Sequence, residues 1–325
     1  MNNTNAVNTA PVQKKSLFKG RTIKTETFLL IVLFFLFVFF TITSPYFLTA
    51  SNISNLLKQT AINGIVAIGM VFVIISAGID LSVGSVVGLS GMMVAMMLKA
   101  GFAIPFAVLV SVLVGTLLGI INGILIHNGK VPAFIATLGT MTVIRGIIML
   151  ISDAKMVAGL PKSFTGVAQL TVAGLPFLFI AWLLVILIAF VISKYTVFGR
   201  NMYAVGSNKE AARLSGINIQ LTTYGIYAFC SFVCAIAGIL MTARLGNGVP
   251  TGGTGYELDA IASAVVGGAS LDGGEGTVIG TVLGAIIMAT LRQGGNLLGI
   301  NSFILEIMIG ALIVVAVLVD KQRKK

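Results

Sequence analysis

Charged residues are scarce in this sequence. They make up 10% of its 325 residues, whereas a soluble domain carries roughly 25%. Hydrophobic residues make up 57% of the chain, and its mean hydropathy is +1.04. This composition excludes an ordinary soluble domain, and it predicts an all-α polytopic membrane protein in which most residues face lipid or other apolar helices.

Catalytic and metal-binding residue types are also scarce. The chain has one histidine, His127, so no Ser/His/Asp set or metal cluster can be assembled. Its two cysteines, Cys230 and Cys234, lie four residues apart on one apolar segment, which predicts packing rather than a disulfide or a metal site. No Gly-Lys-Ser or Gly-Lys-Thr sequence occurs, which excludes a nucleotide-binding loop of the usual kind. We therefore expect no catalysis, no metal and no cofactor on this chain alone.

The formal net charge of +11 is distributed unevenly along the chain. Basic residues gather in the N-terminal arm, in the segment from Lys194 to Leu221 and at the C-terminus. Positive charge at such places anchors membrane proteins on the cytosolic side, so it predicts no nucleic-acid partner. The expected organisation is a cytosolic arm at 1–26, a single transmembrane domain at 27–319 with a cytosolic loop at 194–221, and a cytosolic tail at 320–325.

Ten apolar runs divide the transmembrane domain. Several are shorter than the roughly 20 residues that cross a bilayer, and short, glycine-interrupted spans are tolerated where they are buried or line a cavity. We therefore expect 8–10 membrane helices, several short or broken, packed around a pathway. Fourteen lysines and arginines lie in loops on the side of the N-terminus and six on the other side, which favours both termini in the cytosol. The runs lie at about 27–43, 61–77, 82–98, 103–126, 133–151, 174–192, 222–241, 258–270, 277–291 and 303–319.

The segment from Lys194 to Leu221 is the longest polar interruption in the apolar part of the chain. Asn208 precedes a run of good helix formers, and Gly216 follows it. This pattern predicts a short helix from Asn208 to Leu214 that Asn208 caps. Such a helix between two spans offers a surface to another protein. The alternative is a basic cytosolic loop that only follows the positive-inside rule.

Four ionisable residues are candidate polar sites within the membrane. Arg145 and Glu306 lie in apolar runs, where each is costly unless it faces the interior of the bundle or a polar partner. Asp80 and Asp272 lie in breaks between runs, where a carboxylate can cap a helix N-terminus. Arg145 and Glu306 can pair with each other, and the sequence leaves a structural salt bridge, a helix-end position and a substrate contact open for them. For Asp80 and Asp272 we favour the capping role over a direct role in transport.

Two segments of the chain are weakly similar in sequence. Residues 78–88 and 270–280 each place an acidic break between two apolar runs. Internal duplication is common in transporters, but glycine-rich apolar sequence also produces such echoes by chance.

Longer strings of residues carry a resemblance to a known family. Glu210-Ala211-Ala212 followed by Gly216 resembles the E-A-A-x-x-x-G coupling motif of ABC importer permeases, although the Leu-Pro of the longer consensus is absent. The segments 78–84, 131–139, 198–200, 210–217 and 254–262 are similar to the monosaccharide branch of bacterial ABC permeases. The resemblance covers about residues 45 to 320. Within that branch it points first to ribose, with xylose, galactose and autoinducer-type sugars left open.

The resemblance implies a permease in the bacterial inner (cytoplasmic) membrane that works as a homodimer. An ATP-binding subunit, which carries ATP and Mg, would lie beneath it, and an extracytoplasmic sugar-binding protein would lie above it. The residues expected to couple the chain to the ATP-binding subunit are Glu210, Ala211, Ala212, Arg213 and Gly216.

The outer-face segment from Gly252 to Asp259 is the candidate for gating or for docking of the binding protein. A merely flexible external loop is the alternative. The residues concerned are Gly252, Gly253, Gly255, Tyr256, Glu257 and Asp259.

The competing function is an ion-coupled secondary transporter of a small polar solute. Such a protein shares the composition and the broken helices, and it typically holds its ions with intramembrane carboxylates. Glu306 is the one clear carboxylate of this kind, and such a transporter needs no E-A-A-x-x-x-G loop.

Overall fold

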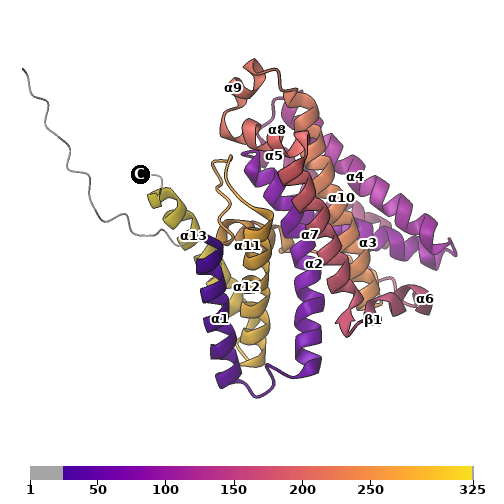
Figure 1. Ribbon diagram of the computed structural model, residues 1–325. Helices are drawn as coiled ribbons and strands as arrows, with labels where there is room; N and C mark the ends of the chain where they lie inside the picture. The colour runs from indigo at the N-terminus through magenta and orange to yellow at the C-terminus, as the bar shows by residue number, and fades with distance from the viewer. Residues whose placement is uncertain (1–24, 324–325) are drawn as a thin grey trace, which may run out of the picture.

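The computed structural model describes residues 25–323 as a bundle of helices (Figure 1). All ten apolar runs are helical, so the predicted all-α class is confirmed for this part of the chain. The ten helices are α1 (Thr25–Thr43), α2 (Ala50–Ile75), α3 (Val83–Lys99), α4 (Ile104–His127), α5 (Ala133–Ser152), α7 (Phe177–Tyr195), α10 (Ile219–Leu245), α11 (Tyr256–Val266), α12 (Val278–Leu297) and α13 (Ser302–Arg323).

The remaining elements are short. Between α5 and α7 the chain forms α6 (Lys162–Thr165), the 3₁₀ turn η1 (Gly166–Gln169) and a two-residue antiparallel hairpin of β1 (Thr171–Val172) with β2 (Leu175–Pro176). Between α7 and α10 it forms α8 (Val197–Ser207) and α9 (Lys209–Leu214). The N-terminal arm lies outside the described residues, apart from its last two. Of the C-terminal tail at 320–325, the first four residues continue α13 and the last two lie outside the described residues.

Seven helices of the described chain are long and apolar enough to cross a membrane: α1, α2, α4, α5, α7, α10 and α12. The polytopic character is therefore confirmed. Helix α11 has 11 residues, and about 16 Å of helix covers only half of a hydrocarbon core about 30 Å thick. It is therefore too short to cross a membrane by itself.

The start of the second helix differs from the prediction. We expect residues 48–60 to be interfacial, but α2 already begins at Ala50. Thr49 caps the helix, because its hydroxyl accepts the N–H of Asn52 at 3.4 Å. The polar residues Asn52 and Lys58 conceal this first part of the helix from a search for apolar runs.

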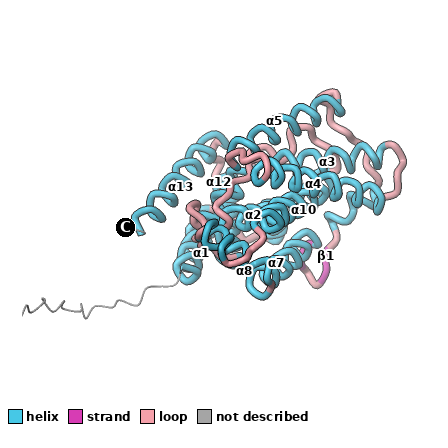
Figure 2. The backbone as a smooth tube through the Cα atoms, turned by 90° about the horizontal axis from the view of Figure 1, so that it is seen from above, coloured by secondary structure: helices cyan, strands magenta, loops and turns pink. Residues whose placement is uncertain are grey.

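Helices α2 and α10 form the centre of the bundle (Figure 2). The apolar 18-residue stretches of α2 and α10 are 83% and 72% buried. The corresponding stretches of the outer helices α1, α4, α5 and α7 are no more than 22% buried. Glycines let the backbones approach closely: a Cβ at Gly238 of α10 would lie 2.2 Å from the carbonyl oxygen of Val87 in α3. The outer faces of α4, α5 and α7 carry exposed apolar residues such as Leu113, Val143 and Leu184, as expected for contact with lipid.

The two central helices have equivalent surroundings. Each is followed by a break and a short helix: residues 76–82 and α3 follow α2, and residues 246–255 and α11 follow α10. Each short helix packs on the central helix of the other half: α3 packs on α10, and α11 packs on α2. The helices that follow do the same, because α4 packs on α10 and α12 packs on α2. Because Ile75 at the end of α2 lies against α8, which leads into α10, the two central helices run in opposite directions.

This arrangement is an inverted repeat of α2–α5 and α10–α13. It supports duplication, but the equivalent breaks are 76–82 and 246–255. The pairing of 78–88 with 270–280 suggested by sequence is wrong, because residues 270–276 only connect α11 to α12.

Candidate functional site

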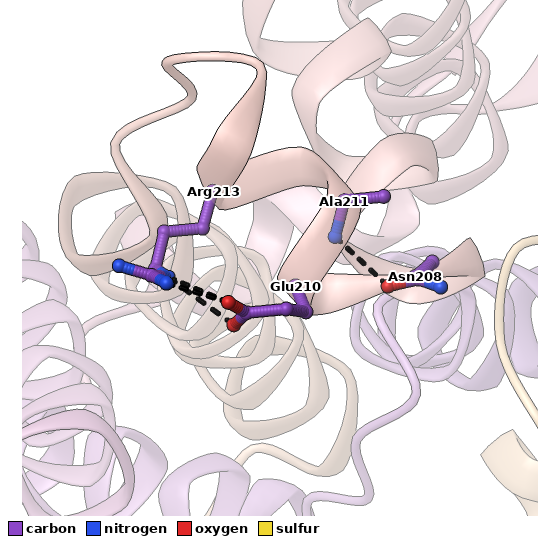
Figure 3. A network of polar contacts seen from close by, with 4 residues as sticks. All are labelled: Asn208, Glu210, Ala211 and Arg213. Carbon is purple, nitrogen blue, oxygen red and sulfur yellow. Dashed lines mark hydrogen bonds and ion pairs between the residues drawn. The ribbon is translucent and has the colours of Figure 1, made fainter.

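Helix α9 stands at one end of the bundle, beyond the ends of the long helices (Figure 1). Asn208 is its N-cap, and the side-chain Oδ1 of Asn208 accepts the N–H of Ala211 at 2.9 Å (Figure 3). The helix ends at Gly216, which has a φ of +82° and donates its N–H to the carbonyl of Arg213. The N–H of Ile217 donates to the carbonyl of Ala212. The predicted short helix with its two ends is confirmed.

The segment 194–221 is not one loop, and this part of the prediction is wrong. Helix α7 continues to Tyr195 and α10 already begins at Ile219. Helix α8 lies between them and buries Met202 and Val205 against the bundle. Residues 208–218, which include α9, are therefore the most exposed stretch of this segment, although Tyr195, Val197 and Arg200 are exposed too.

One alanine anchors α9 to the bundle. Ala212 is 4% exposed and packs with Val205 of α8 and Ile219 of α10. The other residues of α9 face solvent, and Leu214 is 76% exposed. Of the motif residues, Ala212 therefore holds the helix in place, whereas Glu210, Ala211 and Arg213 lie on the accessible surface.

Glu210 and Arg213 form an ion pair on this surface (Figure 3). Arg213 donates from Nη2 to Oε1 at 2.5 Å and from Nε to Oε2 at 3.1 Å. These hydrogen bonds and the positive charge of Arg213 lower the pKa of the Glu210 carboxyl. The same contacts raise the pKa of the Arg213 guanidinium. The pair is therefore fully ionised at neutral pH and presents a fixed dipole.

The segment from Gly252 to Asp259 does not lie on the outer surface as we expect from the sequence. Gly252 and Gly253 are buried against α3, where a Cβ at Gly253 would lie 2.3 Å from the carbonyl oxygen of Gly84. Gly255, Tyr256 and Glu257 are partly buried. The external-loop interpretation is wrong, because residues 250–255 form turns that pack against α3. Its role in gating stays a prediction, and its burial does not favour a docking role.

Asp259 is held inside the bundle. Its Oδ1 accepts a hydrogen bond from Arg292 Nη2 of α12 at 2.5 Å, and its Oδ2 accepts one from Asn63 Nδ2 of α2 at 3.4 Å. The Asp259 side chain therefore joins three helices, and the sequence offered no signal for the partner Arg292.

Arg145 of α5 is partnered by backbone. Its Nη1 donates to the carbonyl oxygen of Gly252 at 2.7 Å, so it holds the turns that precede α11. Pairing of Arg145 with Glu306, which the sequence left open, does not occur, and Glu306 lies exposed on α13.

The two aspartates in the breaks differ from each other. Asp80 is fully buried, and its Oδ1 accepts the N–H and the hydroxyl of Ser82, the residue just before α3. It therefore shapes the chain at the start of α3, close to the predicted capping role. Asp272 is not the cap of α12, because Thr277 is, accepting the N–H of Gly280 at 2.9 Å.

A buried chain of polar side chains escaped the sequence analysis. The Nδ2 of Asn122 donates to the hydroxyl of Ser82 at 2.9 Å, and Thr140 donates to Asn122 Oδ1 at 2.7 Å. These bonds join the break before α3 to α4 and α5. An asparagine in the middle of an apolar run was the available signal.

A multi-pass helical bundle with an inverted repeat, a break after each central helix and an exposed short helix at one end is typical of a membrane transport protein. The chain belongs to the family described as branched-chain amino acid transport system / permease component, whose model matches residues 52–317. The predicted resemblance to transport permeases is therefore confirmed, and the chain is a multi-pass protein of the inner membrane.

Curated relatives cover nearly the whole chain. It is 44% identical over 313 residues to the ribose import permease protein RbsC of Bacillus subtilis (strain 168), with 96% of this chain and 97% of the relative covered. It is 39% identical to RbsC of Escherichia coli (strain K12), with 91% and 93% covered. It is 38% identical to the D-allose transport system permease protein AlsC of the same strain, with 87% of each covered. No solved structure matches the chain.

Proposed function

We propose that this chain is the membrane permease subunit of an ATP-driven importer of a monosaccharide, and that the sugar is ribose. One observation carries the proposal: the accessible α9, with Glu210 and Arg213 outward and Ala212 anchored, stands at the end of a bundle in which the breaks after the two central helices are suited to a pathway. Relatives named as ribose import permeases match nearly the full length, which supports ribose.

The end that carries α9 is the cytosolic end in this proposal. Lys130, Lys194 and Lys209 lie there, in agreement with the positive-inside rule. The bond from Gln293 Nε2 to Asn52 Oδ1 joins the end of α12 to the start of α2 at the opposite end. Helix α1 therefore begins, and α13 therefore finishes, toward the α9 end, which supports both termini in the cytosol.

An ATP-binding subunit, which carries ATP and Mg, docks on α9 in this scheme, and hydrolysis takes place on that subunit. Movement of α9 reaches the bundle through Ala212, since this residue packs on both α8 and α10. An extracytoplasmic sugar-binding protein delivers the sugar at the other end.

A second copy of the chain completes the permease. Exposed Glu306, which lies in the apolar stretch 303–319 of α13, supports this part of the proposal. A carboxylate that faces hydrocarbon is costly, so it requires water or another protein surface. We also propose ten membrane segments, with residues 246–255 and α11 crossing together.

Uptake of labelled ribose tests the proposal. Cells that lack this gene, with the wild-type chain restored, regain high-affinity uptake, and unlabelled D-allose and xylose compete weakly. A Gly216→Pro variant that reaches the membrane should restore none. Restored uptake of another sugar would replace ribose and keep the importer. Uptake that collapses with the proton or sodium gradient while ATP is maintained would favour the secondary transporter.

A further inference from the structure

A cavity of about 650 Å³ opens at the α9 end of the bundle. Three segments enclose it: the hinge between α8 and α9, the connection from α4 to α5, and the break that follows α2. Tyr227 of α10 forms part of its floor. The volume lies within the range of roughly 300–1,000 Å³ that is usual for small-molecule sites.

The charge of this cavity is positive. Lys130 comes from the connection between α4 and α5, and Lys209 comes from the first residue of α9. Among the described residues neither lysine forms an ion pair, and no aspartate or glutamate belongs to the cavity wall. Asp272 and Glu275 are on a neighbouring loop but outside the wall.

Glu210, the acidic residue of α9, does not offset the positive charge of the cavity. Figure 3 shows the Glu210 carboxylate turned toward Arg213 and away from Asn208, which is part of the cavity wall. Arg213 neutralises Glu210 through the hydrogen bonds described above. An anion in the cavity therefore meets two lysines and no carboxylate of the wall. The buried Asp80 lies near Tyr227 but outside the wall.

Polar groups without partners accompany the lysines. The Nδ1 of His127 and the hydroxyl of Tyr227 are buried, belong to cavity residues and have no hydrogen-bond partner among the described residues. Buried polar groups in proteins are almost always hydrogen-bonded, so such orphans indicate a missing partner. Ser207 and the amide of Asn208 add further polar groups to the wall.

We propose that this cavity binds a phosphate ester, held by Lys130 and Lys209 and by the polar side chains between them. Lysine is a usual binder of phosphate oxygens. Two sources supply this chemistry at the cytosolic end, a small phosphorylated sugar and the headgroup of an anionic lipid. A ligand here bridges the hinge before α9 to the bundle and restrains α9. The functional effect of restraining α9 rests on the proposed function, whereas binding of the phosphate ester to the cavity does not.

Binding is tested on the full chain in lipid nanodiscs, without any transport assay. Ribose 5-phosphate and inorganic phosphate are the soluble probes in phosphatidylcholine discs, and added phosphatidylglycerol is the lipid probe. The readout is the shift in melting temperature, because a ligand that binds only the folded state stabilises it. The test variant is Lys130→Gln with Lys209→Gln. The matched control is Lys194→Gln, a lysine at the same end but outside the cavity.

Ribose 5-phosphate is expected to raise the melting temperature of the wild-type chain and of Lys194→Gln. Its affinity for the double variant should fall at least about tenfold. A variant with both lysines replaced by arginine keeps the charge and should keep the binding, which separates loss of charge from misfolding. Stabilisation by phosphatidylglycerol alone, with the same dependence on Lys130 and Lys209, identifies a lipid headgroup as the occupant. Stabilisation by neither probe, or equal shifts in the glutamine double variant and Lys194→Gln, overturns the proposal.

Discussion

Arg292 Nη2 lies 2.5 Å from Asp259 Oδ1, and this ion pair joins α12 to the first turn of α11. The Asp259 side chain is 6% exposed and that of Arg292 is 25% exposed. Helix α11 is too short to cross the membrane, so contacts with its neighbours determine its position. The pair and the bond from Asn63 to Asp259 are the polar part of those contacts.

Removing one member of this pair should destabilise the protein strongly. Asp259→Ala leaves Arg292 unpaired in a largely buried position, and we expect a loss of about 3 kcal/mol, at the low end for buried pairs because Arg292 is partly exposed. The double variant Asp259→Ala, Arg292→Met should lose at least about 1 kcal/mol less than the sum of the single losses. Thermal unfolding in detergent measures all three variants, and additive losses would contradict the pair.

Close packing of α3 on α10 predicts a contrast between two glycines. Gly238→Ala places a Cβ 2.2 Å from the carbonyl oxygen of Val87, which belongs to rigid backbone, and should cost about 1–3 kcal/mol. Gly146→Ala in α5 is the matched control, because no described atom beyond its chain neighbours and the local helix backbone lies within 4 Å of its Cβ. Helix propensity favours that alanine by up to about 1 kcal/mol. Equal melting temperatures for the two variants would contradict the packing.

Gly216 predicts a graded series at the end of α9. Its φ of +82° disfavours side chains, although the space around it is open. Gly216→Ala should therefore cost roughly 1 kcal/mol of local stability, and Gly216→Asn less, because asparagine tolerates this conformation. Gly216→Pro forces φ to about −65° and removes the N–H that donates to the carbonyl oxygen of Arg213. This variant should therefore abolish coupled uptake. Sugar-stimulated ATP hydrolysis by the assembled importer should fall in the order Asn, Ala, Pro, and full activity of the proline variant would refute the coupling role.

The Glu210–Arg213 pair predicts over which pH range docking of the ATP-binding subunit stays constant. The folded-state pKa of Glu210 is below its ordinary value of 4.5. The stabilisation from the ion pair is therefore complete above pH 4.5 and is lost as the pH falls through the lowered pKa. Docking of the ATP-binding subunit should be constant from about pH 5 to 8 in the wild type. Glu210→Gln should weaken docking equally at all pH values in that range while leaving the melting temperature of the isolated chain unchanged, since both side chains are exposed. A wild-type affinity that varies within that range would indicate another titrating group.

Local patterns predicted much of the helical content, because the physical causes are local. The apolar runs identified all ten long or medium helices, and Asn208 and Gly216 identified both ends of α9. Capping and positive φ depend on residues within one turn, so the sequence carries them directly. The same locality explains an error at α2, where polar residues in its first turns concealed a helix that Thr49 starts.

Contacts between distant residues were not predictable in this way. The segment from Gly252 to Asp259 has the composition of an exposed loop, yet Arg145, 107 positions away, holds it inside. The partners Arg292 and Asn63 of Asp259 come from two other helices. Glycines that permit close approach and glycines that form flexible loops look alike in a sequence.

By itself the sequence determined that the chain is a helical, multi-pass membrane protein and that a capped helix carries the outward Glu210, because composition and short-range hydrogen bonding decide these properties. Only the tertiary structure decided that α2 and α10 form the centre, that the two broken segments are equivalent by inversion, and that Lys130 and Lys209 meet at one cavity. These features depend on which helix surfaces pack together, and packing is a property of residues far apart in the chain.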